Sequence, residues 1–386
     1  MKNTLYGNGI NDDYPAIQEL LDTKASEVSL PAPEKCYLIS RTLKIHGGQT
    51  LKLGRFTTIR LMPHSNCSML EDDDFHTYKE NICIDGGIWD MNNAEQAPNP
   101  YHYADETGKT TRDRLNLLGD RKDLTAFADI YTGICMRFCR IRRLIIKNIT
   151  LKNPVTYGVQ MGYTEDFTVR DILFDYTTGA PKLWNMDGIH IEGHCKNGTL
   201  CNLKGTCHDD LVAITADDGL YGPIENITVD GIFAEHAHSA VRLLSHGLPI
   251  KNIKISNVYG SYYVYCIGLT KYHGGEDERG FMKNILIENV AACASEGTAD
   301  VKGGYYPFIW VQKGLDIEGL SIRNVERDEK TYPTPLLKVD EGATVKRMRL
   351  SDIYQESHLD TEVPLLDIEG DVEFLTKENI KSKRQS

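Results

Sequence analysis

A five-residue pattern recurs eight times between residues 157 and 368 of this 386-residue chain. The third and fifth residues of each run are aliphatic or Met, whereas the fourth residue varies freely. This alternation is typical of a strand that turns one face toward a core. The runs are Tyr157–Met161, Asp187–Ile191, Asp210–Ile214, Ser239–Leu243, Tyr265–Leu269, Pro307–Val311, Pro335–Val339 and Pro364–Ile368.

A second class of branched, alternating segments lies between these runs, and each segment adds a further strand to the repeat. They are residues 148–151, 167–172, 226–232, 252–258 and 284–290, with Asn, Asp and Gly where the chain must turn. Several strands per repeat of about 23 to 42 residues, with almost no helical period, indicate a solenoid. We therefore expect an all-β fold, a right-handed, single-stranded parallel β-helix.

The domain organisation follows from this repeat, and we expect one β-helix domain over residues 1–386. Residues 1–30 form an N-terminal cap region, in which Asn11, Asp12 and Asp13 can cap a short helix over residues 14–22. This helix is expected to cover the open end of the solenoid. Residues 92–132 interrupt the repeat and predict an inserted loop. Residues 376–386 are expected to form a C-terminal tail.

Composition excludes several classes of partner. The net charge is -12, and no Lys/Arg run is dense enough to follow a phosphate backbone, so neither nucleic acid nor an anionic membrane is an expected partner. The sequence lacks both a spanning apolar run and the apolar core of a signal peptide, which predicts a cytoplasmic protein with ten reduced cysteines. The cysteine spacings are not those of a zinc site, and we expect no metal and no cofactor.

Stacked coils place equivalent residues about 4.8 Å apart, so the aligned runs become columns on the surface. Asp187 and Asp210 belong to the column that opens each run, and Asp209 and His238 lie one residue before it. Adjacent like charges separate their pKa values, which suits the acid and the base of glycoside hydrolysis. The pattern predicts a carbohydrate-active site without choosing a saccharide chemistry. The flanking polar and aromatic candidates in these columns are Tyr157, Gln160, His190, Ser239, Arg242, Tyr265 and Trp310.

The same residues carry a resemblance to a known family. The segments YGNGINDDYPAIQELLD, ICIDGGIWDMN and ITLKNPVTYGVQM resemble the opening motifs of the pectin-lyase-like β-helix superfamily. Within it, Asn185-Met186-Asp187-Gly188 and His208-Asp209-Asp210-Leu211-Val212-Ala213-Ile214 resemble the N-T-D-G and G-D-D-x-I-A-I motifs of glycoside hydrolase family 28, the polygalacturonase-like enzymes. The likeness covers nearly the whole chain.

The resemblance implies roles for the three acids. Asp209 would be the general acid, and Asp187 and Asp210 would hold and deprotonate a water that inverts the anomeric centre. His208 stands where the family has Gly, as a further candidate for substrate binding. Ser239 stands where the family has a histidine, for which His238 or His236 could substitute.

A second departure concerns the substrate. The family's R-I-K motif falls on Gly268-Leu269-Thr270, so the arginine that binds galacturonate is replaced; Lys271 and Arg242 are the remaining candidates to bind a carboxylate. We therefore expect a hydrolase of pectic or related oligosaccharides other than an ordinary polygalacturonase. The insertion at residues 92–132 and the loop at residues 271–280 would close one end of the cleft, which predicts exo action.

Two other functions fit the same fold. In a calcium-dependent polysaccharide lyase the acids would be ligands of a hard cation and Arg242 the base. In a glycan-binding module the columns would form a non-catalytic ridge. The sequence does not decide between a monomer and a homo-oligomer.

Overall fold

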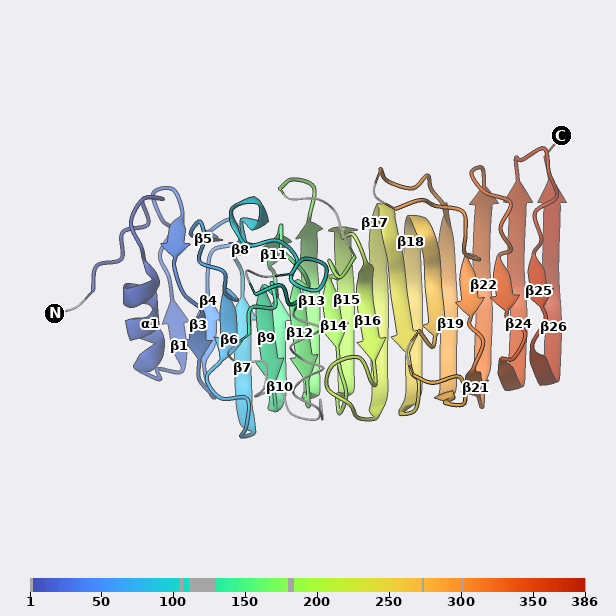
Figure 1. Cartoon of the computed structure of the whole chain (residues 1–386), viewed down its shortest axis with the longest axis horizontal. Helices are drawn as coiled ribbons and strands as arrows, with labels where there is room; N and C mark the ends of the chain where they lie inside the picture. The colour runs from blue at the N-terminus through green and yellow to red at the C-terminus, as the bar shows by residue number, and fades with distance from the viewer. Residues whose placement is uncertain are drawn as a thin grey trace. The chain divides into compact units, whose positions relative to one another are not determined.

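The computed structural model describes residues 3–104, 107–110, 130–179, 184–272, 274–299 and 301–385. These residues contain 26 strands, one α-helix and one 3-10 helix (Figure 1). They form two compact units, residues 1–190 and 191–386, and each consists of coils of a right-handed parallel β-helix. The all-β solenoid predicted from the sequence is confirmed.

The N-terminal unit contains three parallel stacks of short strands. The first stack joins β1 (Glu27–Ser29), β4 (Thr50–Lys52), β7 (Lys79–Asp85), β10 (Ile141–Lys147) and β13 (Glu165–Asp175). The second joins β2 (Tyr37–Ile39), β5 (Thr58–Leu61), β8 (Ile88–Asp90) and β11 (Thr150–Lys152) to the last part of β13. The third joins β3 (Leu43–Ile45), β6 (Leu70–Asp72), β9 (Met136–Cys139) and β12 (Val159–Gly162). β14 (Ile189–Ile191) lies where the first unit ends in the sequence.

In the C-terminal unit longer strands bend around the corners of the coil. One stack joins β15 (Lys196–Thr206), β17 (Ile224–Leu244), β18 (Pro249–Thr270), β19 (Gly280–Ala294), β22 (Leu320–Glu329), β24 (Thr344–Ser357) and β26 (Asp371–Arg384). Another joins β16 (Asp210–Thr215), through β17 and β18, to β20 (Ile309–Val311), β23 (Leu337–Val339) and β25 (Leu366–Ile368). β21 (Leu315–Ile317) pairs with β19 and β24.

The predicted columns are confirmed inside the C-terminal unit. Asp210 is in register with Ser239, and Ser239 with Tyr265. The outward column passes from Ala213 through Arg242 and Gly268 to Trp310. The alternate positions Val212, Val241 and Ile267 are fully buried and form the core.

Asparagines form the corners between stacks, as the sequence predicts. The side chains of Asn197, Asn226, Asn252 and Asn284 form a ladder of amide hydrogen bonds, each 2.9 Å long. All four residues have φ between 54° and 60°, a conformation that Asn adopts more readily than other L-residues. The ladder satisfies amide groups of neighbouring coils at the point where each strand turns.

The N-terminal helix α1 (Tyr14–Asp22) has the predicted bounds and buries Ile17 and Leu21. The predicted capping is confirmed in part. The Asp13 side chain makes no cap hydrogen bond with the helix; it accepts the backbone N–H groups of Tyr6 and Leu38 instead, while Asp12 accepts that of Tyr14 at 3.0 Å.

Two other expectations are modified. Residues 376–384 do not form a tail, because they belong to β26, which ends at Arg384. Leu375 and Ile380 of this strand extend two core columns of β24. Of the inserted loop at 92–132, residues 105–106 and 111–129 lie outside the described residues, and η1 (Asn93–Glu95) is a 3-10 helix.

The structure also bears on the cysteines. No two cysteines in the described residues form a disulfide, and five are buried: Cys135, Cys139, Cys195, Cys207 and Cys266. The other five are partly exposed. No described helix is long and apolar enough to cross a membrane.

Candidate functional site

Six candidate residues gather at the start of β16 and on the next two coils of the C-terminal unit. Asp210 is the first residue of β16, Ser239 and Arg242 lie on β17, and Tyr265 lies on β18. Asp209 and His238 each precede the column residue of their coil. We call this group the Asp210 cluster.

Asp210 is fully buried, and both of its carboxylate oxygens are bound. Arg242 Nε lies 2.8 Å from Oδ2, the Tyr265 hydroxyl donates to Oδ1 at 3.1 Å, and the Ser239 hydroxyl donates to the same oxygen. Burial raises the pKa of Asp210, Arg242 opposes this rise, and the charge of Asp209 adds to it. Asp210 is thus held by three side chains from the two following coils.

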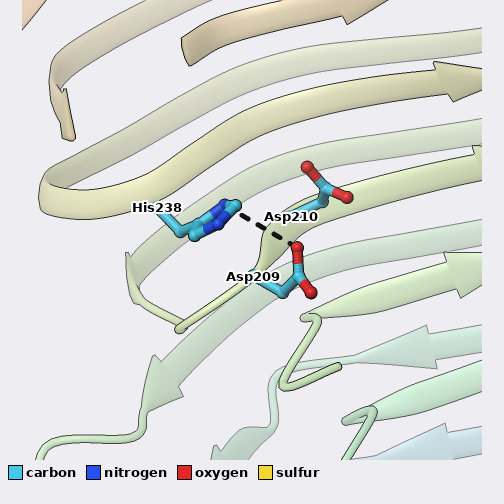
Figure 2. A group of neighbouring side chains, drawn as sticks. All are labelled: Asp209, Asp210 and His238. Carbon is cyan, nitrogen blue, oxygen red and sulfur yellow. Dashed lines mark ion pairs between the residues drawn. The ribbon is translucent and has the colours of Figure 1, made fainter. Parts of the chain in front are cut away.

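Asp209 retains access to solvent at the edge of this cluster. Its side chain is 13% exposed, and Oδ1 lies 3.7 Å from Nδ1 of His238 (Figure 2). The same imidazole nitrogen lies 3.0 Å from the Ser239 hydroxyl oxygen. Of the two histidines that could replace the family's histidine, His238 is therefore the one that faces the acids. His236 is exposed, and its backbone N–H donates to the Ser261 hydroxyl.

A register irregularity positions His238. The pairing of β17 with β18 shifts between Ala234 and Ala237 and again between Ala237 and Ser239, and His236 has a φ of 53°. Such bulges redirect a side chain out of the regular alternation. The irregularity allows His238 and Ser239, adjacent in sequence, to approach Asp209 and Asp210.

The predicted aromatic candidates are mostly packed together. Tyr265 and Trp310 are buried, with ring centroids 6.2 Å apart, and Tyr306 lies 5.1 Å from Trp310. The Trp310 indole donates to Asp340 at 2.9 Å. Tyr272 is 40% exposed and lies edge-on to Trp310, so it is better placed than Tyr265 or Trp310 to contact a sugar face.

The remaining two candidates of this unit are less closely tied to the cluster. Lys271 follows the end of β18, and its ammonium group donates to the Gly275 carbonyl at 2.7 Å. The backbone N–H of Lys271 donates to the side-chain oxygen of Gln312 at 2.6 Å. His208 precedes Asp209 in sequence and is buried.

The other predicted residues belong to the N-terminal unit. Asp187 and His190 are buried, with Oδ2 and Nδ1 2.5 Å apart, and the Tyr157 ring stacks on His190 at 4.0 Å. The Tyr176 hydroxyl donates to the Asp187 carbonyl at 3.1 Å. Gln160 is buried on β12, in register with Arg137. The structure thus brings Asp187, His190 and Tyr157 together, and their catalytic and binding roles stay predictions.

Among the described residues, one group has the geometry of a metal site, and it lies in the Asp210 cluster. Asp209, Asp210 and His238 each offer one ligand atom, and these atoms lie within 4.8 Å of one another. However, the Arg242 guanidinium already neutralises Asp210. A hard cation would have to compete with this guanidinium for the same carboxylate, so the donor set fits a cation poorly.

Two residues around the candidate site were not identified from the sequence. The Tyr263 ring lies 5.4 Å from that of His238, edge-on, and Asp340 binds the Trp310 indole. Both lie outside the aligned column positions, so the repeat gave no signal for them. Tyr263 could have been suspected only from its place two residues before Tyr265.

Comparison with known proteins supports the fold. No family model and no curated protein matches the chain. Among solved structures it is similar to the surface adhesin PfbA of Streptococcus pneumoniae, with 16% identity, a TM-score of 0.61, and 98% of this chain and 96% of that chain covered. It is also similar to a hyperthermoactive exopolygalacturonase of Thermotoga maritima, with 17% identity, a TM-score of 0.61, and 95% and 89% covered.

A third similar structure is a tailspike protein of the E. coli bacteriophage HK620 in complex with a pentasaccharide. The identity is 12%, the TM-score 0.64, and 96% of this chain and 64% of that chain are covered. Enzymes, an adhesin and a tailspike thus share this architecture. At these identities the likeness establishes the β-helix fold, and function has to be argued from the site.

Proposed function

We propose that the protein is an exo-acting glycoside hydrolase that cleaves pectic or related oligosaccharides with inversion at the anomeric carbon. The observation that carries the proposal is the contrast between two adjacent acids. Asp210 is fully buried and paired with Arg242, whereas Asp209, beside His238, is largely buried but keeps 13% of its side chain exposed. A general acid has to lie within hydrogen-bond reach of the substrate, and a neighbouring residue with a fixed side chain keeps it in position.

In this proposal Asp209 donates the proton to the leaving glycosidic oxygen. Ser239, Tyr265 and Arg242 fix Asp210, which in turn fixes the start of β16 and the neighbouring Asp209. An inverting acid and base stand about 6.5 to 9.5 Å apart. The sequence motif assigns Asp210 to the attacking water as well, while its pairing with Arg242 holds its side chain in place. The water-activating role of Asp187 rests on its sequence motif.

The chemistry of the cluster also bears on the substrate. Arg242, a candidate to bind a uronate carboxylate, neutralises Asp210 instead. This favours an oligosaccharide other than plain polygalacturonate. A carbohydrate ligand also agrees with the similar structures, which include an exopolygalacturonase and a tailspike with a bound pentasaccharide.

The test is reducing-sugar release from a panel of pectic, rhamnogalacturonan and neutral plant oligosaccharides. We expect the wild type to act on at least one of them, and Asp209→Asn to lose about 10²- to 10⁴-fold in kcat without a change in Tm. The matched control is Asp316→Asn, which removes the charge of an exposed carboxylate on β21. Asp316 is paired with Arg279, and this variant should keep its activity. Proton NMR of the first product should show the inverted anomer.

Two other outcomes would replace the proposal. Activity that disappears with a chelator and yields an unsaturated, ultraviolet-absorbing product would indicate a calcium-dependent lyase that uses the Asp209, Asp210 and His238 triad. Equal binding of a sugar by the wild type and Asp209→Asn, with hydrolysis by neither, would make the cluster a glycan-binding surface.

A further inference from the structure

The C-terminal unit carries a surface hollow that the proposed hydrolase chemistry does not use. The hollow has a volume of about 500 Å³ and is lined by residues of β19, β22 and β24, three neighbouring strands of one stack (Figure 1). No residue of the Asp210 cluster lines it. The polar residues that line the hollow are Asn284, Ser321, Arg323, Arg347, Arg349 and Ser351.

A break in the asparagine ladder leaves the space for this hollow. Ile285 is in register with Leu320, so the corner that follows Asn284 in the ladder is Gly319. A Cβ atom on Gly319 would lie 3.7 Å from Asn284 Oδ1 and 3.8 Å from Arg347 Nη2. Because the ladder has no side chain at this corner, the amide oxygen and the guanidinium group border the same open space.

Three arginines line the hollow in a row. Arg347 and Arg349 lie two residues apart on β24. Arg323 on β22 is in register with Ser351, so it continues the row by two further positions in the neighbouring coil. At about 3.3 Å per residue, the row extends about 13 Å along the strands. A row of this length can bind several anionic groups in succession.

The positive charge of this row is only partly neutralised. Arg323 Nε donates to Glu288 at 2.7 Å. By contrast, no carboxylate of the described residues lies within 4.0 Å of the guanidinium group of Arg347 or Arg349. Glu318, which lies near Arg347, is paired with a lysine at 2.6 Å. Two exposed guanidinium groups therefore remain available to a ligand in a protein of net charge -12.

The lining combines these cations with groups that suit a sugar. The hydroxyls of Ser321 and Ser351 and the amide of Asn284 can form hydrogen bonds with sugar hydroxyls, and Leu286 adds apolar surface. Guanidinium groups bind carboxylates through two parallel hydrogen bonds. A small inorganic anion would use the cations alone, whereas this mixed lining fits a chain of sugars that carries carboxylates.

We propose that this hollow is a second carbohydrate-binding site, which binds an oligosaccharide with uronate residues. Arg347 and Arg349 bind carboxylates of the oligosaccharide, while Asn284 and the two serines bind its hydroxyls. The hollow shares no residue with the Asp210 cluster, so this binding does not depend on the hydrolase activity. A site of this kind holds the protein on an acidic polysaccharide.

Two variants test the charge and the space of the hollow separately. Arg347→Gln with Arg349→Gln removes two exposed charges that make no ion pair, so the variant should fold. Gly319→Leu keeps every charge and fills the hollow. The φ of Gly319 is not positive, and an added Cβ meets no atom closer than 3.7 Å, so the backbone can accept a side chain there.

The experiment is isothermal titration calorimetry of the full 386-residue chain with trigalacturonate, uncharged galactotriose or sodium sulfate. Every protein in the series also carries Asp209→Asn, so that hydrolysis does not disturb the titration. We expect trigalacturonate to bind at least about tenfold more tightly than the other two probes. In each variant the dissociation constant of one trigalacturonate site should rise at least about tenfold, while any site at the Asp210 cluster is unchanged.

The matched control is Arg41→Gln with Arg55→Gln, which removes two exposed arginines of the N-terminal unit and should leave binding unchanged. Thermal unfolding shows whether each variant is folded. Unaltered trigalacturonate binding by the folded arginine variant or by folded Gly319→Leu would overturn the proposal. Equally tight binding of galactotriose or of sulfate would also overturn it, because the hollow would then not select a uronate.

Failure of the hydrolase proposal gives a different result. In that case the chain with Asp209 intact cleaves none of the oligosaccharides, but trigalacturonate still binds in the calorimeter and is still lost on Arg347→Gln with Arg349→Gln. The two proposals therefore succeed or fail independently.

Discussion

Two buried clusters of acids, one in each unit, resemble each other in composition but differ in the neighbours and the exposure of the acids. In the N-terminal unit, Glu71 lies 2.6 Å from Lys44 and 3.1 Å from Arg137. Asp72 lies 2.9 Å from Lys79 and accepts the Cys139 N–H at 2.8 Å. We call these residues the Asp72 cluster.

In the Asp210 cluster the two adjacent acids differ in their neighbours and in their exposure. Asp210 is fully buried and 2.8 Å from Arg242, whereas the Asp209 side chain is 13% exposed and lies 3.7 Å from His238. Buried acids alone therefore do not identify a catalytic site in a solenoid, since the Asp72 cluster has them in a closed network. The greater exposure of the Asp209 side chain, 13% against 6% for Glu71 and 0% for Asp72, is the feature that separates the two clusters.

The largest effect is expected from removing the arginine of each cluster. An unmatched buried charge costs about 3 to 5 kcal/mol. Arg242→Met should approach this loss, because Asp210 would keep only hydroxyl donors. Arg137→Met should lose less, since Lys44 remains beside Glu71. Thermal and urea unfolding of both variants measure the difference.

Two further variants make this comparison stricter. Arg242→Met combined with Asp210→Asn should regain part of the loss, because the second change removes the unmatched charge. Arg279→Met removes an exposed pair with Asp316 and should change stability by less than about 1 kcal/mol. If Arg137→Met loses as much unfolding free energy as Arg242→Met, or more, then Lys44 does not compensate for the missing Arg137 beside Glu71.

A smaller effect, on pH dependence, is expected inside the Asp72 cluster. Burial raises the pKa of Asp72 to about 7 from an ordinary 3.8, although Lys79 and the Cys139 N–H act in the opposite direction. The folded protein then holds a proton that the unfolded chain has lost. The contribution of Asp72 to stability is therefore present below about pH 4 and decreases as the pH rises toward 7.

This sign can be checked with Asp72→Asn, which cannot titrate. The unfolding free energy of the wild type, relative to the variant, should fall between about pH 4.5 and 7.5. Glu71 behaves in the opposite way: burial opposes Arg137 and Lys44, but these cations hold its pKa below the ordinary value. Glu71→Gln should therefore show wild-type stability lost toward acid pH, and parallel profiles for the two variants would refute these directions.

The columns were predictable because a parallel solenoid converts sequence repeats directly into neighbours in space. Asp210, Ser239 and Tyr265 align in the sequence and are in register in the structure. The earlier coils through Leu43–Ile45, Leu70–Asp72 and Met136–Cys139 were not recognised. Their runs have only three or four residues. In addition, Asp72 and Met136 are separated by 63 residues, and this segment contains the insertion.

The contacts of the site were less predictable than its columns. A column alignment states which backbones are neighbours, but the pairing of Arg242 with Asp210 depends on side-chain direction and burial. For the same reason the alignment did not show that the aromatic candidates Tyr265 and Trp310 pack together in a buried aromatic cluster. The displacement of His238 toward Asp209 depends on a register shift that a regular repeat does not encode.

The smallest effect is expected at Lys271, which the sequence suggested as a carboxylate-binding residue. Its ammonium group is bound to the Gly275 carbonyl of the same loop, and such partly exposed contacts contribute little. Lys271→Met should change kcat/KM by less than about threefold, equally for neutral and uronate-terminated oligosaccharides. Lys271→Arg keeps the charge and serves as the matched variant. A rise in KM of about tenfold with Met but not Arg, and only for uronate-terminated substrates, would mean that Lys271 leaves Gly275 to bind a carboxylate, and the accessible part of the cluster would then include this loop.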